Sequence, residues 1–320
     1  MAELESGTPG DGWERKILEK VALAAIAEQR TARRWSMAFK MLIVLYLFVV
    51  LFLGMGWFKK PGDNSSGKHT AMVELRGVIA SDTQASADNI TSGLQAAFKD
   101  SNTQGVVLRI NSPGGSPVQA GYINDEIKRL RGLYPNIPLY AVVEDICASG
   151  GYYVAAAADK IYVDKASIVG SIGVVMDGFG FTGTMEKLGV ERRAITAGEN
   201  KRFLDPFSPV NPAHKAFAEK MLAEIHEQFI AVVREGRGKR LKETPDIFSG
   251  YVWTGPKSIE LGLADALGST ESVARDVIKA EEIVDFTPHE NIAERVAKKF
   301  GAAAAQALVN VTATSGAQLR

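Results

Sequence analysis

One short segment carries the residue of this chain with the clearest chemical potential, Ser149. It lies in DICASGGYY (residues 145–153), between an apolar run and a stretch of small residues. A serine at the point where a buried strand ends and a helix begins has an exposed hydroxyl, and the first N–H groups of the helix favour negative charge nearby. Gly150 and Gly151 would let a substrate backbone approach closely. Ser is also a preferred helix cap, so this segment alone fits a nucleophile and an inert N-cap equally.

A second glycine-rich segment, NSPGGS (residues 111–116), follows the apolar run Gly105–Ile110. Pro followed by two glycines predicts a tight turn at the carboxyl end of a strand, where ligands bind in open α/β sheets. The backbone N–H of Gly114 or Gly115 is then a candidate donor to an oxyanion. An ordinary turn into a helix is the alternative, because glycine turns are common.

A serine nucleophile needs a base. The histidines are His69, His214, His226 and His289, and none lies in a glycine-rich loop, so a Ser/His/Asp triad has little support. A buried lysine is the other option, because desolvation favours the neutral amine that accepts a proton. Lys201, in AGENKRFLDPF (residues 197–207), is the candidate. Loop lysines are ordinarily solvated, so its position alone does not make it a base.

The elements that must position these residues alternate along the chain. Strands are predicted at Ala71–Ala80, Gly105–Ile110, Pro138–Val143, Lys160–Val163 and Ser171–Met176. Helices are predicted at Ser86–Lys99, Val118–Leu133, from about Gly150, at 212–240, at 254–280 and at 290–309. Strands that alternate with helices indicate an α/β fold with right-handed crossovers.

An uncharged apolar segment, residues 41–58, precedes this region. As a helix its 18 residues would span roughly 27 Å, close to the thickness of a hydrocarbon core. A buried core helix is rarely so long without a polar residue, and a cleaved signal peptide would start nearer the N-terminus. The segment therefore predicts one transmembrane helix. The basic residues on its two sides slightly favour a cytoplasmic N-terminus.

Composition adds two limits. Lys+Arg and Asp+Glu both number 37 in 320 residues, so charge gives no reason to expect a nucleic-acid partner. The single cysteine, Cys147, excludes an internal disulfide, and we interpret it as a packed thiol. No cofactor and no metal are predicted.

Several motifs taken together resemble the signal peptide peptidase A family of bacterial serine peptidases. In order along the chain they are INSPGGS (110–116), ASGGYYVAAAADKI (148–161), VGSIGVV (169–175), AGENKRFLDPF (197–207) and GYVWTGPKSIELGLADALG (250–268). They cover about Ala71–Gly268, which is most of the chain outside the apolar segment.

The resemblance implies an α/β fold similar to the Clp protease and crotonase group, a spiral of βαβ units, preceded here by one transmembrane helix. It implies that Ser149 is the nucleophile, that Lys201 is the general base and that Ser171 holds the lysine amine. Backbone N–H groups of Gly114 and Gly150 would form the oxyanion hole. The chain departs from many relatives beside the base, where Asn200 replaces an aromatic residue and Arg202 adds a charge.

The resemblance also predicts how the whole molecule is organised. The expected parts are a cytoplasmic segment (1–40), the transmembrane helix (41–58), a linker (59–70), the peptidase domain (71–285) and an Ala-rich helix with a tail (286–320). The expected protein is a homo-oligomer in a bacterial inner membrane, with its catalytic domain on the extracytoplasmic side. Its expected substrates are cleaved signal peptides and other apolar peptides, and the lipid bilayer is its partner through residues 41–58.

Three alternatives stay open at this point. A crotonase-type acyl-CoA enzyme would share the fold and the glycine turns without needing Ser149 or Lys201. A non-catalytic membrane scaffold would keep the same fold with a vestigial Ser/Lys pair. Within the family, the chain also fits a SohB-like branch.

Overall fold

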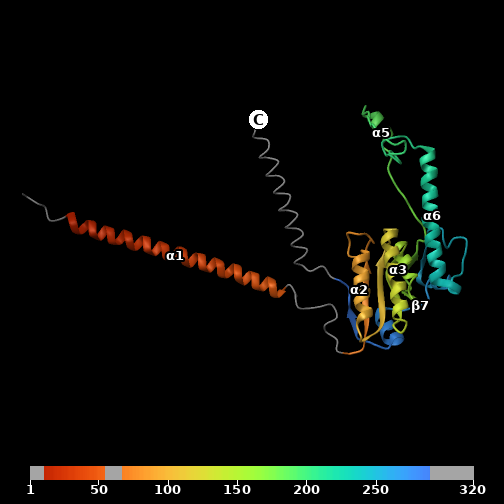
Figure 1. Ribbon diagram of the computed structural model, residues 1–320, viewed down its shortest axis with the longest axis horizontal. Helices are drawn as coiled ribbons and strands as arrows, with labels where there is room; N and C mark the ends of the chain where they lie inside the picture. The colour runs from red at the N-terminus through yellow and green to blue at the C-terminus, as the bar shows by residue number, and fades with distance from the viewer. Residues whose placement is uncertain (1–10, 55–66, 289–320) are drawn as a thin grey trace, which may run out of the picture. The chain divides into compact units, whose positions relative to one another are not determined.

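The computed structural model describes residues 11–54 and 67–288 (Figure 1). The chain divides into two compact units, one of which contains residues 1–60 and 290–320 and the other residues 61–289. The predicted Ala-rich helix at 290–309 lies outside the described residues. The domain boundaries expected from the sequence stay predictions.

A single long helix, α1 (Asp11–Gly54), forms the described part of the first unit. It runs without a break across the boundary expected between residues 40 and 41. From Met41 to Val49 every side chain is exposed. Residues 55–58, the last part of the predicted transmembrane segment, lie outside the described residues. Over the described ranges, no helix has both the length and the apolar character needed to cross a membrane.

The second unit alternates strands and helices as predicted. Its first half contains β1 (His69–Arg76), α2 (Ala87–Lys99), β2 (Thr103–Ser112), α3 (Pro117–Leu133), β3 (Leu139–Ala148), α4 (Gly150–Ala155), β4 (Lys160–Val163) and β5 (Ile168–Gly170). Its second half contains α5 (Thr182–Lys187), α6 (Pro212–Arg237), the 3₁₀ turn η1 (Gly238–Arg240), β6 (Val252–Thr254), α7 (Gly255–Glu260), β7 (Ala266–Leu267), α8 (Thr270–Ser272), the π-helical turn η2 (Val273–Ile278) and β8 (Ile283–Asp285).

One mixed sheet organises this unit, with the main strand order β6-β5-β3-β2-β1-β8. All pairs along it are parallel except β5 with β6. Strand β3 changes partner along its length, because Tyr140–Val142 pair with β4 and Ile146–Ala148 pair with β5. Parallel strands joined through helices fit the predicted Clp protease and crotonase class of fold.

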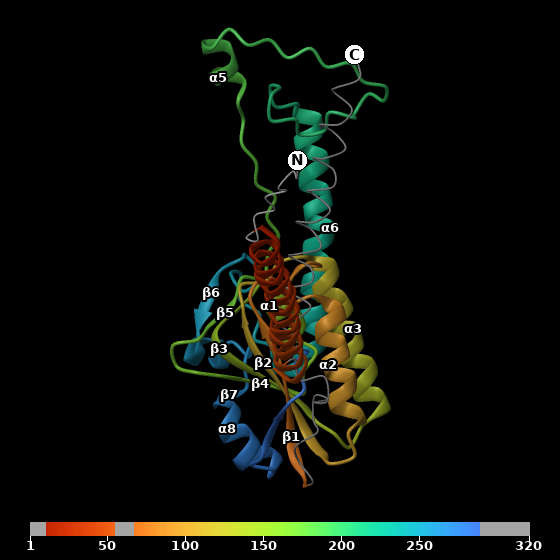
Figure 2. The same ribbon diagram turned by 90° about the vertical axis from the view of Figure 1, so that its left-hand side faces the viewer.

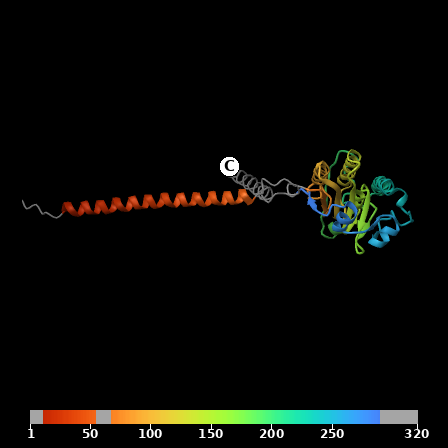
Figure 3. The same ribbon diagram turned by 90° about the horizontal axis from the view of Figure 1, so that it is seen from below.

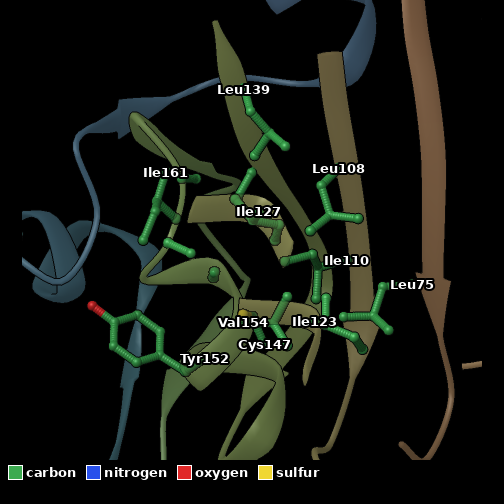
Figure 4. Close-up of a cluster of buried hydrophobic side chains, with 14 of the residues drawn as sticks. Leu75, Leu108, Ile110, Ile123, Ile127, Leu139, Cys147, Tyr152, Val154 and Ile161 are labelled. Atoms are coloured by element: carbon green, nitrogen blue, oxygen red, sulfur yellow. The ribbon is translucent and has the colours of Figure 1, made fainter. Parts of the chain in front are cut away.

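Helices α2 and α3 pack side by side on one face of the sheet (Figures 2 and 3). Alternate residues of β2, namely Val106, Leu108 and Ile110, point into the core beneath them, and all are fully buried. Figure 4 shows this core, which also contains the side chain of Cys147. Val107, from the other face of β2, belongs to a smaller cluster on the opposite side of the sheet.

Two predicted elements differ in the structure. The strand expected at Ser171–Met176 is wrong: β5 ends at Gly170, and Ser171 has a backbone φ of 52°, which turns the chain out of the extended conformation. The helical region expected at 254–280 is broken into α7, the short strand β7, α8 and η2. Gly262, with a φ of 76°, ends α7, and a Cβ at this position would lie 1.8 Å from the carbonyl oxygen of Arg240.

Residues 175–217, called the arm below, project from the domain (Figure 2). No residue of the arm is buried. Its apolar side chains are well exposed, among them Val175 (85%), Phe179 (80%) and Ile195 (100%). The chain leaves the domain after the buried Ile172 and returns along α6, where Nε2 of His226 lies 3.2 Å from the carbonyl oxygen of Ile172.

Candidate active site

Ser149 lies at the junction between β3 and α4, as predicted. It takes the N-cap position of α4, but its side chain makes no capping hydrogen bond. Its backbone N–H donates to the carbonyl oxygen of Gly170 (2.8 Å), which fixes the residue to the end of β5. The hydroxyl therefore does not cap the helix and is left available for chemistry.

The backbone of Ser149 is strained. Its φ of 51° and ψ of −124° place it in a region that non-glycine residues rarely occupy, at a cost of about 1–3 kcal/mol. Such strain persists where the surroundings fix the backbone, and here Gly170 on one side and the turn at 112–116 on the other do so. This geometry turns the serine away from the strand direction and presents its side chain at the sheet edge.

The glycine turn at 112–116 packs directly on Ser149. A Cβ on Gly114 would lie 2.7 Å from both the Gly150 nitrogen and the Ser149 Cβ, so only glycine fits there. The hydroxyl of Ser112 holds the turn, because it donates to the carbonyl oxygen of Gly77 (2.7 Å) and accepts from the N–H of Gly114 (3.1 Å). The structure thus brings together the two segments that the sequence singled out.

The two glycines of this turn differ in their hydrogen bonds. Gly114, the predicted oxyanion donor, already donates its N–H to Ser112. Gly115 lies opposite Ile79 in an isolated parallel bridge. The N–H of Ile79 donates to the carbonyl oxygen of Gly114, and the N–H of Ser116 donates to the carbonyl oxygen of Ile79. Within the described part of the chain, the N–H groups of Gly115 and Gly150 have no acceptor. A Cβ on Gly150 would lie 3.3 Å from the Gly115 nitrogen, so these two residues are neighbours.

Ser171 lies beside the nucleophile. Ala148 and Gly170 are paired across β3 and β5, so the residues that follow them, Ser149 and Ser171, leave the sheet at the same level. Both serines have a positive φ. The N–H of Ser171 donates to the carbonyl oxygen of Tyr251 (2.7 Å), and the residue is partly exposed.

Lys201, the predicted base, lies on the arm and is not brought to Ser149. Its side chain is exposed, and its N–H donates to the carbonyl oxygen of Gly198 (3.1 Å). The neighbouring Asn200 contacts His214 at the start of α6 (3.0 Å). His214 precedes His226, the contact with the domain, by twelve residues, or about 18 Å of helix. A single copy of the chain therefore holds the two proposed dyad residues well apart.

The charge that Arg202 adds beside Lys201 is compensated. Arg202 donates from Nε and Nη2 to Asp205 (2.9 and 2.6 Å), and Arg192 pairs with the same carboxylate. Asp205 is a residue that the sequence reasoning missed. The acidic residue three positions after an arginine was visible in the motif, but its second partner, Arg192, comes from a distant part of the arm.

The other titratable candidates lie elsewhere. Cys147 is fully buried, and burial raises the pKa of its thiol, which confirms the interpretation as a packed thiol. His69 stacks on Phe286 at the start of β1. In the part of the chain that the structure describes, no three His, Cys, Asp or Glu side chains are grouped so that they could hold a metal ion.

A cavity of about 710 Å³ opens on the sheet face opposite α2 and α3. Charged side chains line it, including Arg76, Arg109, Glu144 and Glu271. None of the five predicted site residues lines this cavity. It is therefore separate from the Ser149 site.

Comparison with known proteins identifies the class to which this fold and site belong. Residues 133–284 match the sequence model of peptidase family S49, and this range contains Ser149, Ser171 and Lys201. A candidate protease of Synechocystis is 30% identical over 211 residues, 66% of this chain and 74% of that protein. A candidate signal peptide peptidase SppA of Enterococcus faecium is 28% identical over 233 residues, 70% of this chain and 67% of that protein.

A further similarity covers a much larger protein. The Na⁺/H⁺ antiporter NhaA of Brucella abortus is 46% identical over 182 residues, 57% of this chain. The chain spans only 25% of the length of that protein, so the antiporter name is not transferred to it. Taken together, these similarities show that the chain belongs to peptidase family S49.

Proposed function

We propose that this protein is a serine endopeptidase that cleaves apolar peptides with a Ser149–Lys201 dyad. The observation that carries the proposal is the state of Ser149. Its hydroxyl makes no capping hydrogen bond and its backbone is strained. Beside it lie two N–H groups without acceptors, those of Gly115 and Gly150. This arrangement suits a nucleophile beside an oxyanion hole. Gly115 replaces Gly114 in this proposal, because the Gly114 N–H is already bonded to Ser112.

The reaction follows from these roles. The neutral amine of Lys201 takes the proton of the Ser149 hydroxyl, and the oxygen bonds to the substrate carbonyl carbon. The N–H groups of Gly115 and Gly150 stabilise the resulting oxyanion. The C–N bond then breaks as the Lys201 ammonium returns its proton to the leaving amine. Lys201 next deprotonates a water molecule, whose oxygen bonds to the ester carbon. The Lys201 ammonium then protonates the serine oxygen as its bond to the acyl group breaks, and Ser171 holds the lysine amine throughout.

The dyad in this proposal is assembled from two copies of the chain, one supplying Ser149 and the other Lys201. Support comes from the exposed Lys201, from its distance from the domain and from the exposed apolar side chains of the arm. Large exposed apolar patches mark interaction surfaces. Burial by a second copy would also favour the neutral form of the lysine amine, the form that accepts a proton.

The same proposal places the protein at a bacterial inner membrane, anchored by residues 41–58. The exposed apolar side chains from Met41 to Val49 on α1 support it, together with the uncharged sequence that continues to Phe58. An anchor would hold the active site where apolar peptides partition, which suits cleaved signal peptides as substrates. The peptidase domain would lie on the extracytoplasmic side.

The test is hydrolysis of a signal-peptide substrate by the full chain and by Ser149→Ala and Lys201→Ala, each checked for folding and assembly. Both variants are expected to lose at least about 10³-fold in kcat/KM. Full activity of either variant would contradict the dyad. Absence of any activity in the parent protein on apolar peptides would favour the scaffold or the acyl-CoA enzyme.

A further inference from the structure

We propose that Asp205 is the positioning residue for Lys201: its carboxylate closes the loop that presents the base. The inference rests on the proposed function, because it concerns the base of that dyad. It identifies a residue that touches neither substrate nor nucleophile and acts through the lysine alone.

Asp205 is an unusually well-satisfied carboxylate for an exposed arm. Its side chain is only 6% exposed, although no residue of the arm is buried as a whole. One oxygen accepts from Arg192 and from the N–H of Phe207 (3.2 Å). The other accepts from Arg202 (2.6 and 2.9 Å) and from the hydroxyl of Ser208 (3.0 Å).

These bonds close a loop around the base. Arg192 and Asp205 are thirteen residues apart, and Lys201 lies between them. Residues 193–200 are all exposed. Next to Lys201, the contact between Asn200 and His214 (3.0 Å) is a second restraint on this part of the arm. Closing a flexible loop at its two ends removes much of its conformational freedom. The closure is extended by Phe207, which packs against the guanidinium of Arg192 (5.1 Å) and the ring of Phe181 (5.4 Å).

Asp205 stays ionised under assay conditions. Burial raises its pKa, but the hydrogen bonds from Arg202, Phe207, Ser208 and Arg192 outweigh that effect and hold the pKa well below the usual range. The charge matters as much as the shape. An asparagine at this position would keep one acceptor oxygen but turn an NH₂ group toward guanidinium donors, and two arginines would lose their counter-charge.

The experiment compares Asp205→Asn with Glu191→Gln in the full chain. The control makes the same carboxylate-to-amide change on the same arm, at an exposed pair, Glu191 with Arg193, where little effect is expected. Phosphonylation of Ser149 by a fluorophosphonate is followed for both its rate constant and its final extent. A merely structural role would lower the final extent, because some chains would be inactive, and would leave the rate of the remaining chains unchanged.

The expected result for Asp205→Asn is a rate constant lower by about 10- to 100-fold with full final labelling. Asp205→Glu, which keeps the carboxylate, is expected to recover part of the rate. A rate within about twofold of the parent and of Glu191→Gln would overturn the proposal. If Lys201→Ala is labelled as fast as the parent, the dyad itself is wrong, and that outcome does not depend on Asp205.

Should Asp205→Asn fail to fold or assemble, Ser208→Ala decides the question. This variant removes the hydrogen bond from Ser208 to Asp205 and the one that Arg202 donates to Ser208, and it keeps the carboxylate and its direct bonds with both arginines. Its rate constant is expected to fall by about 3- to 10-fold with full final labelling. An unchanged rate would overturn the proposal.

Discussion

Ser112 illustrates how a single hydroxyl organises the site. It joins the loop after β1, through Gly77, to the glycine turn beside Ser149. Replacing it with alanine frees the N–H of Gly114 and the carbonyl of Gly77, and loosens the turn that aims Gly115. We expect Ser112→Ala to lower kcat by about 10-fold or more, measured on a peptide substrate with active sites counted by phosphonylation.

Ser116→Ala is the matched control. Its hydroxyl caps α3 through a long contact with the N–H of Gln119 (3.4 Å) and takes no part in holding the turn on Ser149. The variant is expected to lose about 1 kcal/mol of stability and to keep kcat within about twofold. Equal losses of kcat in the two serine variants would argue against a specific role for Ser112.

At this scale the sequence predicted much of the site. The motifs placed Ser149 and the glycine turn together because both follow predicted strand ends, and parallel strands share their carboxyl edge. Ser171 was assigned by the resemblance alone, since the pattern put it at the start of a strand rather than after the end of one. The choice between Gly114 and Gly115 depended on the rotamer of Ser112, which no sequence pattern reports. The ion pairs of Asp205 with Arg192 and Arg202 were missed because they join residues of a segment without regular structure.

Helix α6 is the element that attaches the arm to the domain. Near its end Arg237, with a fully buried side chain, pairs with Asp265 (2.9 Å) and donates to the carbonyl oxygen of Gly262 (2.8 Å). Removing Arg237 leaves the Asp265 carboxylate with the more exposed Arg240 as its counter-charge (3.1 Å). We expect Arg237→Met to lower the free energy of unfolding by about 3 kcal/mol, measured by urea titration.

Arg234→Met, one turn earlier on α6, is the control, because Arg234 pairs with Glu243 at the surface and should contribute at most about 1 kcal/mol to stability.

The pH dependence of stability gives a second test of the Arg237–Asp265 pair. Burial raises the pKa of Asp265, but its bonds and charge interactions, chiefly with Arg237, hold it below the ordinary 3.8. Its stabilising contribution is complete above that pH and is lost on acidification below it, so the parent should lose more stability than Arg237→Met as the pH falls from about 5 to 2. Equal slopes would contradict this assignment.

The elements themselves were largely predictable, since runs of β-branched residues and amphipathic stretches marked β1–β4, α2, α3 and α6. The strand expected after Gly170 failed because Ser171 and Ile172 look extended by composition, while the fold needs a turn there to release the arm. Contacts with residues distant in sequence fix this turn: the N–H of Ser171 donates to the carbonyl oxygen of Tyr251, and His226 lies 3.2 Å from the carbonyl oxygen of Ile172.

At the scale of the whole molecule, a dyad shared between copies has a sharp consequence. Ser149→Ala retains Lys201 and Lys201→Ala retains Ser149, so co-assembly of the two inactive variants should restore some sites. With random mixing in equal amounts, about a quarter of the sites would contain both groups. The expected activity is therefore about a quarter of the parent's, measured after joint refolding or co-expression.

Each variant alone, treated identically, provides the baseline for this mixing. No recovery in a mixture that demonstrably contains hetero-oligomers would mean that both residues must belong to one chain. The arm would then have to fold back on its own domain. Sequence reasoning predicted an oligomer but not a dyad shared between copies, because the separation of Ser149 and Lys201 that motivates this proposal is a property of the folded chain.

The position at which the arm leaves and rejoins the domain has a further, evolutionary consequence. Ile172, before the arm, and His226, after it, are in contact (3.2 Å), so the segment between them behaves as an insertion into the α/β domain. Lengthening such an insertion costs little, since loop-closure entropy grows only slowly with length. Members of the family are therefore expected to differ more in the length of the arm than in the sheet and glycine turn that fix Ser149.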